Sequence, residues 1–484
     1  MQFEREQTLG TTIDARGVCD VVWTRIVEAD RTAPTDAPGS DGAAVAALRA
    51  LFVETGILLA KGADRWPPSV RRRWREQAGC DPAGAIAAMA SAGLCWRTSL
   101  LHDAGVWRGP ASVWSAGALH LFLCELDPAA ARADEPTADR AWVWSAPTDL
   151  LVRFSRGELS PLPWLLCIAR TVERGGKLEA PALAARVREQ AGKELDWELV
   201  EGVRALAVRT PTLPPATHTN AYLLGSAQAL LVEPAPEDED EIDALVRWVD
   251  EAIRRGVRPI AIVATHHHRD HVGAARALCA RLSLPLWAHR ETARRLASQL
   301  RVDRWLQDGD RIELAGAAPT RVQVLHTPGH APGHLCLLEE RTGALVAGDM
   351  VAGVGTILVD PDDGDMSAYL ASLERLAALR PAVLLPAHGG PLRPAVEVLE
   401  RYVTHRRWRE RRVLDAVRER ARPVLPHELL ARVYDDVPSS AWPLAVRSVE
   451  SHLLDLQRRG LLERRAEGWM ALEHSEPRPA DRTG

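Results

Sequence analysis

An apolar run that leads directly into a cluster of polar side chains is the feature that most constrains this chain. Residues 261–273 read Ala-Ile-Val-Ala-Thr-His-His-His-Arg-Asp-His-Val-Gly. Alternate residues at the end of a strand project to one side, so His266 and His268 can hold one metal ion. Asp270 and His271 lie past the turn and can reach a second ion. A single ion would not need all four side chains, so the run predicts a site for two.

Three further candidate ligands lie downstream, each after an apolar run and beside glycine. They are His330 in His-Thr-Pro-Gly-His, Asp349 in Val-Ala-Gly-Asp and His388 in Leu-Pro-Ala-His-Gly-Gly. Glycine permits the tight turns that aim a ligand into a shared cleft. Oxygen and imidazole donors without thiolate suit zinc, manganese or iron, and zinc is the favoured prediction. Any one of these histidines alone would be an ordinary loop residue, whereas the whole set predicts metal binding.

The composition is that of a folded chain with several domains. Its 484 residues suit two to four domains, and 46% hydrophobic with 26% charged residues are ordinary values for a globular protein. The N-terminus has no basic stretch before an apolar core, and no run of eighteen apolar residues occurs, so secretion and membrane spanning are disfavoured. Seven cysteines without a close Cys-x-x-Cys pair suit a reducing compartment. We expect a cytoplasmic protein without a membrane partner, whose oligomeric state the sequence leaves open.

The order of strand-like and helical segments divides the chain into five parts. Between 203 and about 391, short β-rich runs alternate with helical stretches, which is typical of a layered α/β domain. The runs are 221–232, 259–264, 321–325, 344–347 and 383–385. The predicted parts are an N-terminal domain at 1–175, a helical linker at 176–202, a central domain at 203–400, a C-terminal domain at 401–473 and a tail at 474–484.

The ordered ligand set resembles that of the metallo-β-lactamase superfamily. The pattern is H-x-H-x-D-H followed by G-H, G-D and H-G, and the resemblance covers residues 203–400. It implies an αββα sandwich and a metal-dependent hydrolase. It also implies that His266, His268 and His330 bind a first divalent ion, that Asp270, His271 and His388 bind a second, and that Asp349 bridges both. Two ions roughly 3.5–4 Å apart can acidify a bridging water and polarise the scissile bond. Asp270 is the expected catalytic residue, since it can orient the hydroxide or pass a proton to the leaving group.

Departures from individual branches of the superfamily narrow the substrate. No cysteine stands among the candidate ligands, as it does in many antibiotic-degrading members, so penicillin hydrolysis is disfavoured. His268 stands where flavin-linked di-iron members carry Glu, and His388 follows Asp349 by 39 positions, too few for the cap of the RNA-processing branch. We expect a metal-bridging hydroxide to attack an ester, a thioester or a phosphodiester. His334 is a candidate substrate contact, and a loop histidine that bonds backbone is the alternative.

The C-terminal part has the pattern of a winged helix. Residues 408–422, 426–434 and 442–459 read as three helices, and two short strands are expected around Gly468. The pattern resembles the β-lactamase-associated winged helix of the β-lactamase-like-protein-2 group. The arginines within 406–412 are expected to form a solvated helix face.

A basic third helix suggests an alternative function. Some members of that group cleave single-stranded RNA, and a single-strand endoribonuclease could use Arg447, Arg458 and Arg459 to meet phosphates. Glu450 and Asp455 interrupt this basic surface, and the formal charge of -5 gives no global attraction to polyanions. The candidate partners are therefore a small-molecule ester or thioester, or single-stranded RNA, and the winged helix has docking or dimerisation as a competing role.

The N-terminal part carries an incomplete match to the Nudix box. Residues 47–59 resemble its helix and turn, but the pattern R-E-x-x-E-E-x-G is kept only at Arg49, Glu54 and Gly56. Nudix enzymes hold magnesium with several carboxylates on this helix, and two of them are replaced. We predict a degenerate Nudix-like α+β domain without catalysis. A non-enzymatic alternative for the whole chain is a regulator or scaffold with a vestigial metal site, against which the complete ligand set argues.

Overall fold

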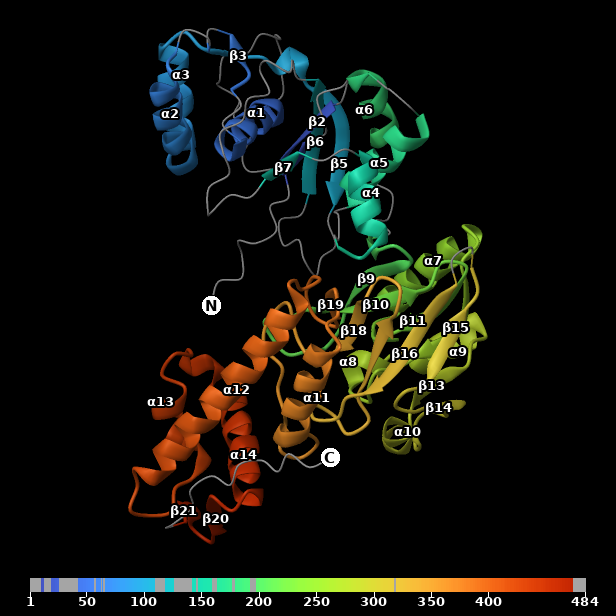
Figure 1. The fold of residues 1–484 in the computed structure, drawn as a ribbon, viewed down its shortest axis with the longest axis vertical. Coiled ribbons are helices and arrows are strands. Elements are labelled where there is room, and N and C mark those ends of the chain that lie inside the picture. Colours follow the sequence, from blue (N-terminus) through green and yellow to red (C-terminus); the bar gives the residue numbers. More distant parts are fainter. Residues whose placement is uncertain are drawn as a thin grey trace. The chain divides into compact units, whose positions relative to one another are not determined.

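The computed structural model divides the chain into two compact units, which are described separately. The described residues are 10–12, 19–25, 42–55, 58–61, 63, 66–108, 118–125, 142–144, 147–158, 163–175, 179–191, 197–316 and 319–472. One unit comprises residues 1–155 and 159–197, and the other comprises 156–158 and 198–484 (Figure 1). Across the described ranges, every helix is too short or too polar to cross a membrane.

The first unit is built on an antiparallel sheet with the strand order β2-β6-β5. Its other elements are short strands and helices. The bounds are β1 Gly10–Thr12, β2 Cys19–Arg25, α1 Gly42–Thr55, β3 Ala60–Lys61, α2 Pro68–Cys80, α3 Pro82–Ser91, β4 Cys95–Trp96, β5 His102–Arg108, β6 Ala118–Glu125, β7 Trp142–Trp144, α4 Pro147–Ser155, α5 Pro163–Gly175 and α6 Ala180–Arg188. These elements do not by themselves show a Nudix fold, and Gly56 and the side chain of Glu54 lie outside the described residues.

Two apolar cores cover opposite faces of this sheet. Phe122 of β6 packs in one core with Leu48 of α1. Leu121, its neighbour in sequence, points to the other face, because successive strand residues alternate, and it packs in a second core with Leu183 and Val187 of α6. The segment expected to be a linker therefore contributes a helix to the core of the first unit.

The second unit contains two sheets that are layered between helices. The seven-stranded sheet has the order β14-β13-β12-β11-β10-β9-β8, and the five-stranded sheet has the order β15-β16-β17-β18-β19. The bounds are β8 Trp197–Val200, β9 Val203–Arg209, β10 His218–Leu224, β11 Gln228–Val232, β12 Arg258–Val263, β13 Leu286–His289, β14 Arg304–Leu306, β15 Arg311–Leu314, β16 Thr320–His326, β17 Leu335–Glu339, β18 Ala344–Gly348 and β19 Val383–Pro386. The strand-like runs expected between 221 and 385 match these strands, except that 221–232 comprises β10, a turn and β11, and that 259–264 extends one residue beyond β12.

Helices cover both outer faces and complete an αββα sandwich. On the seven-stranded sheet lie α7 Glu239–Arg254 and α9 Ala275–Leu282, whose Leu245 and Leu278 pack with Ile262 of β12. On the five-stranded sheet lie α11 Met366–Ala378 and α12 Ala395–Arg418, whose Leu373 and Leu399 pack with Leu345 and Leu384 (Figure 1). Two shorter helices, α8 Arg269–Val272 and α10 Arg290–Leu296, follow β12 and β13. The predicted layered α/β class is confirmed.

The C-terminal elements form the predicted winged helix. They are the end of α12, η3 Pro426–Leu429, α13 Leu430–Val433, η4 Ser439–Ala441, α14 Trp442–Arg458, β20 Leu462–Arg465 and β21 Gly468–Ala471. Val413 of α12, Leu453 of α14 and Trp469 of β21 share their core. Gly468 has a φ of 139°, and a Cβ there would lie 2.4 Å from the Val424 carbonyl oxygen, which explains glycine at this turn. The expected domain boundary at 400/401 falls inside α12, which runs through both domains.

The expectation of a solvated arginine face on α12 is wrong for two residues. Arg406 and Arg409 are buried, with exposed fractions of 4% and 2%. Arg406 donates a hydrogen bond to the Ile357 carbonyl, and Arg409 donates to the Val433 carbonyl and to both carboxylate oxygens of Asp436. The reason is that α12 lies between α11 and the winged helix, so these guanidinium groups join the two domains instead of meeting water.

Candidate metal centre

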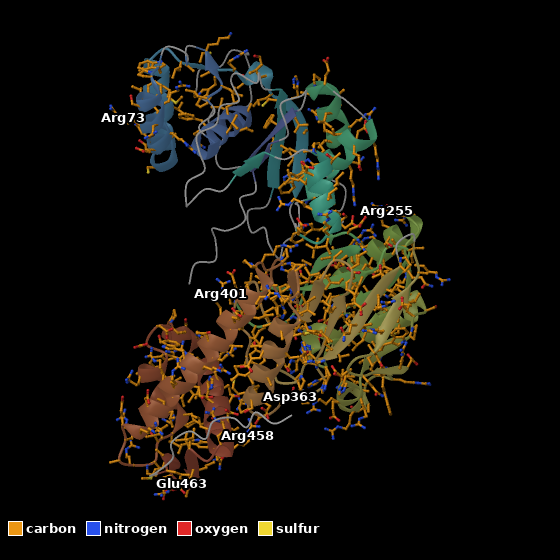
Figure 2. All side chains as sticks on the ribbon, viewed as in Figure 1. Arg73, Arg255, Asp363, Arg401, Arg458 and Glu463 are labelled. Carbon is orange, nitrogen blue, oxygen red and sulfur yellow. The ribbon has the colours of Figure 1, made fainter. Side chains whose placement is uncertain are left out.

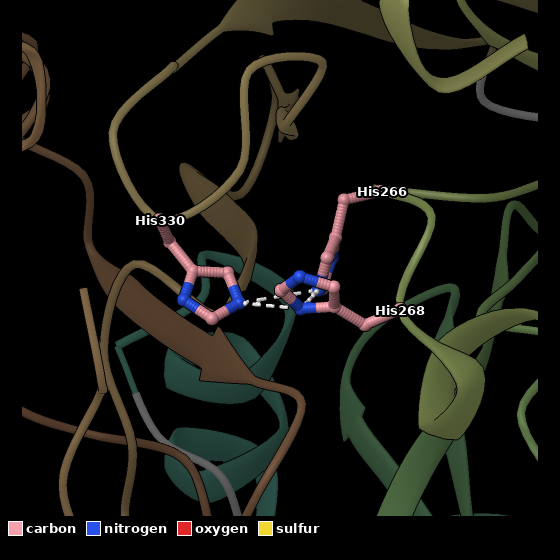
Figure 3. Close-up of side chains that lie close together, drawn as sticks. All are labelled: His266, His268 and His330. Atoms are coloured by element: carbon pink, nitrogen blue, oxygen red, sulfur yellow. Dashed lines mark hydrogen bonds between the residues drawn. The ribbon is translucent and has the colours of Figure 1, made fainter. Parts of the chain in front are cut away.

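Three imidazoles from two loops converge on one point. His266 and His268 lie in the loop after β12, and His330 lies in the loop after β16. Nδ1 of His268 lies 3.0 Å from Nε2 of His266 and 3.0 Å from Nε2 of His330, and the two Nε2 atoms are 3.3 Å apart. Figure 3 shows the three rings directed toward one another. The structure thus brings together the three side chains that were expected to hold the first ion.

The outer nitrogens of two of these rings face groups that only accept hydrogen bonds. Nε2 of His268 lies 3.0 Å from Oδ2 of Asp363, and Nδ1 of His330 lies 2.8 Å from the Leu358 carbonyl oxygen. Each outer nitrogen must therefore carry the ring proton. In a neutral imidazole the other nitrogen then has a free lone pair, so His268 and His330 direct lone pairs inward.

The third ring has the same orientation, fixed by a buried carboxylate. Thr265 donates its hydroxyl proton to Oε1 of Glu233 over 2.6 Å, so its oxygen is left to accept from Nδ1 of His266, 2.9 Å away. Nε2 of His266 is then unprotonated as well. Three lone pairs that meet at these separations repel one another unless a cation lies among them. Nitrogens around a tetrahedral ion at about 2.05 Å are roughly 3.3 Å apart, which is close to the observed distances.

Four side chains form a second group beside the first. They are Asp270, His271, Asp349 and His388. Nε2 of His271 lies 3.7 Å from Oδ2 of Asp270 and 3.6 Å from Oδ2 of Asp349. Nε2 of His388 lies 3.6 Å from Oδ2 of Asp270 and 3.4 Å from Oδ1 of Asp349. Oδ2 of Asp349 also lies 3.4 Å from Nε2 of His330, so this carboxylate stands between the two groups.

In the second group, Nδ1 of each imidazole faces a protein oxygen, Nε2 faces the carboxylates of Asp270 and Asp349, and buried atoms are left without partners. Nδ1 of His271 lies 3.2 Å from Oε1 of Glu233, and Nδ1 of His388 lies 2.9 Å from the His218 carbonyl oxygen. Among the described residues, Nε2 of His271 and Oδ1 of Asp349 are buried without a hydrogen-bond partner. Buried polar atoms are nearly always satisfied, so orphans that point at one another are what a metal site requires. Imidazole and carboxylate donors fit a divalent ion such as zinc.

The charges of the two groups differ. Burial lowers the pKa of His266 well below its usual value, and burial lowers the pKa of His330 to about 4, so both rings are neutral at pH 7. Burial also opposes the charged forms of His271 and His388, but nearby carboxylates outweigh it and raise the pKa of both rings. The largest of these contributions comes from Asp270 for His271 and from Asp349 for His388. Cation binding at the second group therefore competes with protonation of these imidazoles.

Comparison with known proteins shows to which family the chain belongs. Residues 214–388 match the model of the metallo-beta-lactamase superfamily, and residues 426–469 match that of the beta-lactamase associated winged helix domain. Lactamase-like protein vrtG of Penicillium aethiopicum is 30% identical over 224 residues, which cover 46% of this chain and 67% of that protein. The chain belongs to the metallo-β-lactamase superfamily.

Two other relatives of this superfamily member carry different names. The beta-lactamase-like protein 2 homolog of Drosophila melanogaster is 28% identical over 251 residues, which cover 50% of this chain and 84% of that protein. The atrochrysone carboxyl ACP thioesterase of Aspergillus chevalieri is 31% identical over 202 residues, which cover 42% of this chain and 61% of that protein. Each match covers about half of this chain or less, so the function of the whole chain has to be inferred.

A buried polar pair, which sequence reasoning missed, holds the loop of His388 in the metallo-β-lactamase domain. The amide of Asn220 donates to the carbonyls of Pro386 and Gly389, at 2.9 and 2.7 Å, and the hydroxyl of Tyr222 donates to Pro386 at 2.6 Å. Both side chains are almost fully buried. An asparagine directly before the apolar run 221–224 was the available signal, since a buried amide must find partners.

Asp363 is a second residue that sequence reasoning missed. Its Oδ2 lies 3.0 Å from His268 and 3.2 Å from Nε2 of His267, while Arg295 donates to its Oδ1 over 3.1 Å. Burial opposes the charged carboxylate, but the bonds from His267 and His268 outweigh it and hold the pKa of Asp363 well below its usual range. The guanidinium at this carboxylate disfavours a further cation among His267, His268 and Asp363. Asp363 instead orients His268.

His334 has a geometry that fits the alternative of a backbone contact. It is fully buried, and Nε2 accepts a hydrogen bond from the backbone N–H of Asp349 over 3.0 Å. Its Nδ1 lies 2.9 Å from Oγ1 of Thr327. Both ring nitrogens are therefore engaged with protein groups, and nothing in this arrangement supports a substrate contact by His334.

The three arginines that the endoribonuclease alternative would use to meet phosphates all have acidic partners within the chain. Arg447 contacts Asp360 and Asp362, and Arg458 contacts Asp365. The third, Arg459, lies 2.8 Å from Glu410 and 3.3 Å from Asp455. Helix α14 thus turns these charges toward acidic residues of the metallo-β-lactamase domain, of α12 and of α14 itself.

Proposed function

We propose that this chain is a hydrolase that uses two divalent metal ions, with one ion held by each group of side chains. The first would be held by His266, His268 and His330, the second by Asp270, His271 and His388, and both by Asp349. The position of Asp349 carries this proposal. One of its oxygens lies 3.4 Å from His330 and 3.6 Å from His271, and the other lies 3.4 Å from His388. A single carboxylate can therefore reach both ions.

The residues around the two ions divide the work of hydrolysis. Two divalent ions supply Lewis acidity and lower the pKa of water near them. Asp270 is the most exposed of the second group, with 17% of its side chain accessible, compared with 11% or less for Asp349, His271 and His388. An accessible carboxylate beside the reacting centre can orient the attacking water and exchange protons with solvent. We assign this role to Asp270.

The substrate that we favour is a small-molecule ester or thioester. One relative is named as an atrochrysone carboxyl ACP thioesterase. The single-strand endoribonuclease alternative loses its main support, because Arg447, Arg458 and Arg459 are paired with acidic residues. Hydrolysis of a thioester needs an activated water and a polarised carbonyl, both of which the proposed site would provide.

Metal analysis together with hydrolysis tests this proposal. The purified chain should bind two equivalents of zinc, and the loaded chain should hydrolyse an acyl thioester or an aryl ester faster than an unstructured fluorogenic RNA. Asp270→Ala should lose one ion and about 100-fold in kcat. The matched control is Asp243→Ala, which removes an exposed carboxylate of α7 and should change neither. Failure of the parent to bind metal would refute the proposal, and RNA as the faster substrate would replace the ester or thioester.

A further inference from the structure

One loop carries the outer partners of two imidazoles in the first group. Residues 357–365 connect the site to α11. The Leu358 carbonyl oxygen lies 2.8 Å from Nδ1 of His330, and Oδ2 of Asp363 lies 3.0 Å from Nε2 of His268. The position of this loop therefore decides how two of the three rings are oriented and which of their nitrogens carry protons.

Two arginines of the winged helix bind this loop on both sides of Asp363. Arg447 of α14 donates from Nε to Oδ2 of Asp360 over 3.0 Å, and from Nη2 to Oδ1 of Asp360 over 2.7 Å and to Oδ2 of Asp362 over 2.5 Å. Arg458, at the C-terminal end of α14, donates to Asp365. Figure 2 labels Asp363 and Arg458, which lie on the two sides of this junction.

Two further contacts fix the ends of the loop. Arg406 of α12 donates to the Ile357 carbonyl, next to Leu358. At the other end, the hydroxyl of Ser367 donates to Asp455 of α14, a side chain that is 1% exposed. Side chains of the C-terminal domain thus contact the loop at both of its ends and at the aspartates between them.

The loop needs such cations because of its own charge. It reads Asp360-Pro-Asp-Asp-Gly-Asp365, with four carboxylates in six residues. Like charges this close in the sequence repel one another, so cations that neutralise them stabilise the loop. Arg447 bridges the carboxylates on one side of Asp363, and Arg458 neutralises the one on the other side. Without them, we expect this repulsion to shift the loop and to weaken the contact between Asp363 and His268, although Arg295 also holds Asp363.

We infer that the winged helix is a positioning element for the first metal site. In this role Arg447 holds the 357–365 loop so that Asp363 can orient His268. The inference rests on the proposed two-metal function, and it gives the C-terminal domain a purpose that does not involve nucleic acid. Loss of a partner that orients a metal-binding histidine typically changes metal affinity by about 10–100-fold. Loss of Arg447 should therefore lower the affinity for one ion and leave the affinity for the other unchanged.

The experiment measures zinc affinity by chelator competition, independently of activity. Arg447→Ala should release one of the two ions at a chelator concentration about 10-fold lower than the parent does, while the second ion keeps its affinity. The matched control is Arg432→Ala, which removes an exposed ion pair with Glu419 in the same winged helix and should leave both affinities unchanged. Far-UV circular dichroism verifies that each variant is folded.

A double-mutant cycle tests the route through the loop. Asp363→Asn should lower the affinity for the same ion as Arg447→Ala does. The double variant should bind that ion no more weakly than Asp363→Asn alone, because the arginine acts through this carboxylate. If Arg447→Ala does not fold, Asp360→Asn with Asp362→Asn removes the same ion pairs from the loop side and carries the same expectation.

The outcomes separate the two proposals. A parent chain that binds no zinc refutes the proposed function. A parent that binds two ions, combined with a folded Arg447→Ala that keeps both affinities, overturns only the positioning role. Equal losses in Arg447→Ala and Arg432→Ala would also overturn it, since they would reflect general weakening of the winged helix. Additive losses in the double variant would show that Arg447 does not act through Asp363.

Discussion

The imidazole of His334 and the backbone of Asp349 are joined by a buried hydrogen bond of 3.0 Å, with the Asp349 N–H as donor. The same ring contacts Thr327 through Nδ1. Gly348 leaves room for this contact, because a Cβ on Gly348 would lie 2.5 Å from Nε2 of His334. The ring therefore fixes the backbone from which Asp349 reaches both groups of candidate ligands.

We expect His334→Leu to lower metal content and stability instead of substrate affinity. The substitution leaves the buried Asp349 N–H without an acceptor, which costs about 1–3 kcal/mol, and frees Asp349 to shift. Metal analysis should show less than two equivalents of zinc, with a lower midpoint of thermal unfolding. A raised KM with unchanged zinc content and unchanged stability would instead indicate that His334 contacts substrate.

Glu233 should control the affinity of the second ion. This buried carboxylate lies 3.2 Å from Nδ1 of His271 and accepts the Thr265 hydroxyl proton that fixes His266. Glu233→Gln keeps the shape and removes the charge, so His271 becomes a weaker base and we expect an affinity about 10-fold lower for one ion. Zinc titration against a chelator measures this change. Glu313→Gln, at an exposed strand position, is the control, and an equal loss there would contradict the assignment.

The junction between the loop and the winged helix should weaken in acid. Burial opposes the charged form of Asp360, but the bond from Arg447 outweighs it and lowers the pKa of Asp360, and Arg458 likewise lowers the pKa of Asp365. A carboxylate whose pKa is lowered on folding contributes stability above its unfolded pKa of about 3.9, and this contribution is lost as pH falls through the folded value. The relevant window therefore lies below about pH 4.

Comparison of the parent with Arg447→Ala isolates this effect. With a chelator present throughout, so that metal loss does not contribute, the difference in free energy of unfolding between the two should stay constant from pH 7 to pH 5. It should shrink below about pH 4, as Asp360 takes up a proton and the ion pair disappears. A difference that persists unchanged at pH 3 would show that the stabilisation by Arg447 does not come from these carboxylates.

The grouping of the seven candidate ligands could be predicted because their pattern is local. His266, His268, Asp270 and His271 lie within six residues, and the remaining three each follow an apolar run beside glycine. The carboxyl ends of buried strands reach the same edge of a sandwich, so such loops meet whatever the details of the helices. The strands found at 258–263, 344–348 and 383–386 agree with this reasoning.

The residues that support these ligands could not be predicted in the same way. Asp363 reaches His268 across 95 positions, and Asn220 reaches Gly389 across 169. No periodicity links such pairs, because their contact depends on how the second sheet and its loops settle on the first. The burial of Arg409 had the same cause: a run of arginines predicts a solvated helix face unless a second domain covers it, and here the winged helix does.

One buried histidine of the winged helix should make the C-terminal domain sensitive to acid. His452 of α14 is fully buried, and within the described part of the chain neither of its ring nitrogens has a hydrogen-bond partner. Burial is the main cause that lowers its pKa to about 3, with Arg406 and Arg409 adding to the effect. The unfolded chain takes up a proton near pH 6.5, whereas the folded chain does not until about pH 3, so stability falls as pH drops between these values.

His452→Leu should therefore stabilise the winged helix, and more at pH 5 than at pH 7.5. Leucine is similar in size and needs no hydrogen-bond partner, so the cost of burying two unsatisfied nitrogens, about 1–3 kcal/mol, disappears at both values of pH. Hydrogen–deuterium exchange of peptides from α14 measures the local free energy of opening for parent and variant at each pH. His427→Leu, at an exposed position, should show no such gain. Faster exchange in His452→Leu than in the parent at pH 5 would mean that the imidazole has a stabilising contact, and that its protonation is not what weakens this domain.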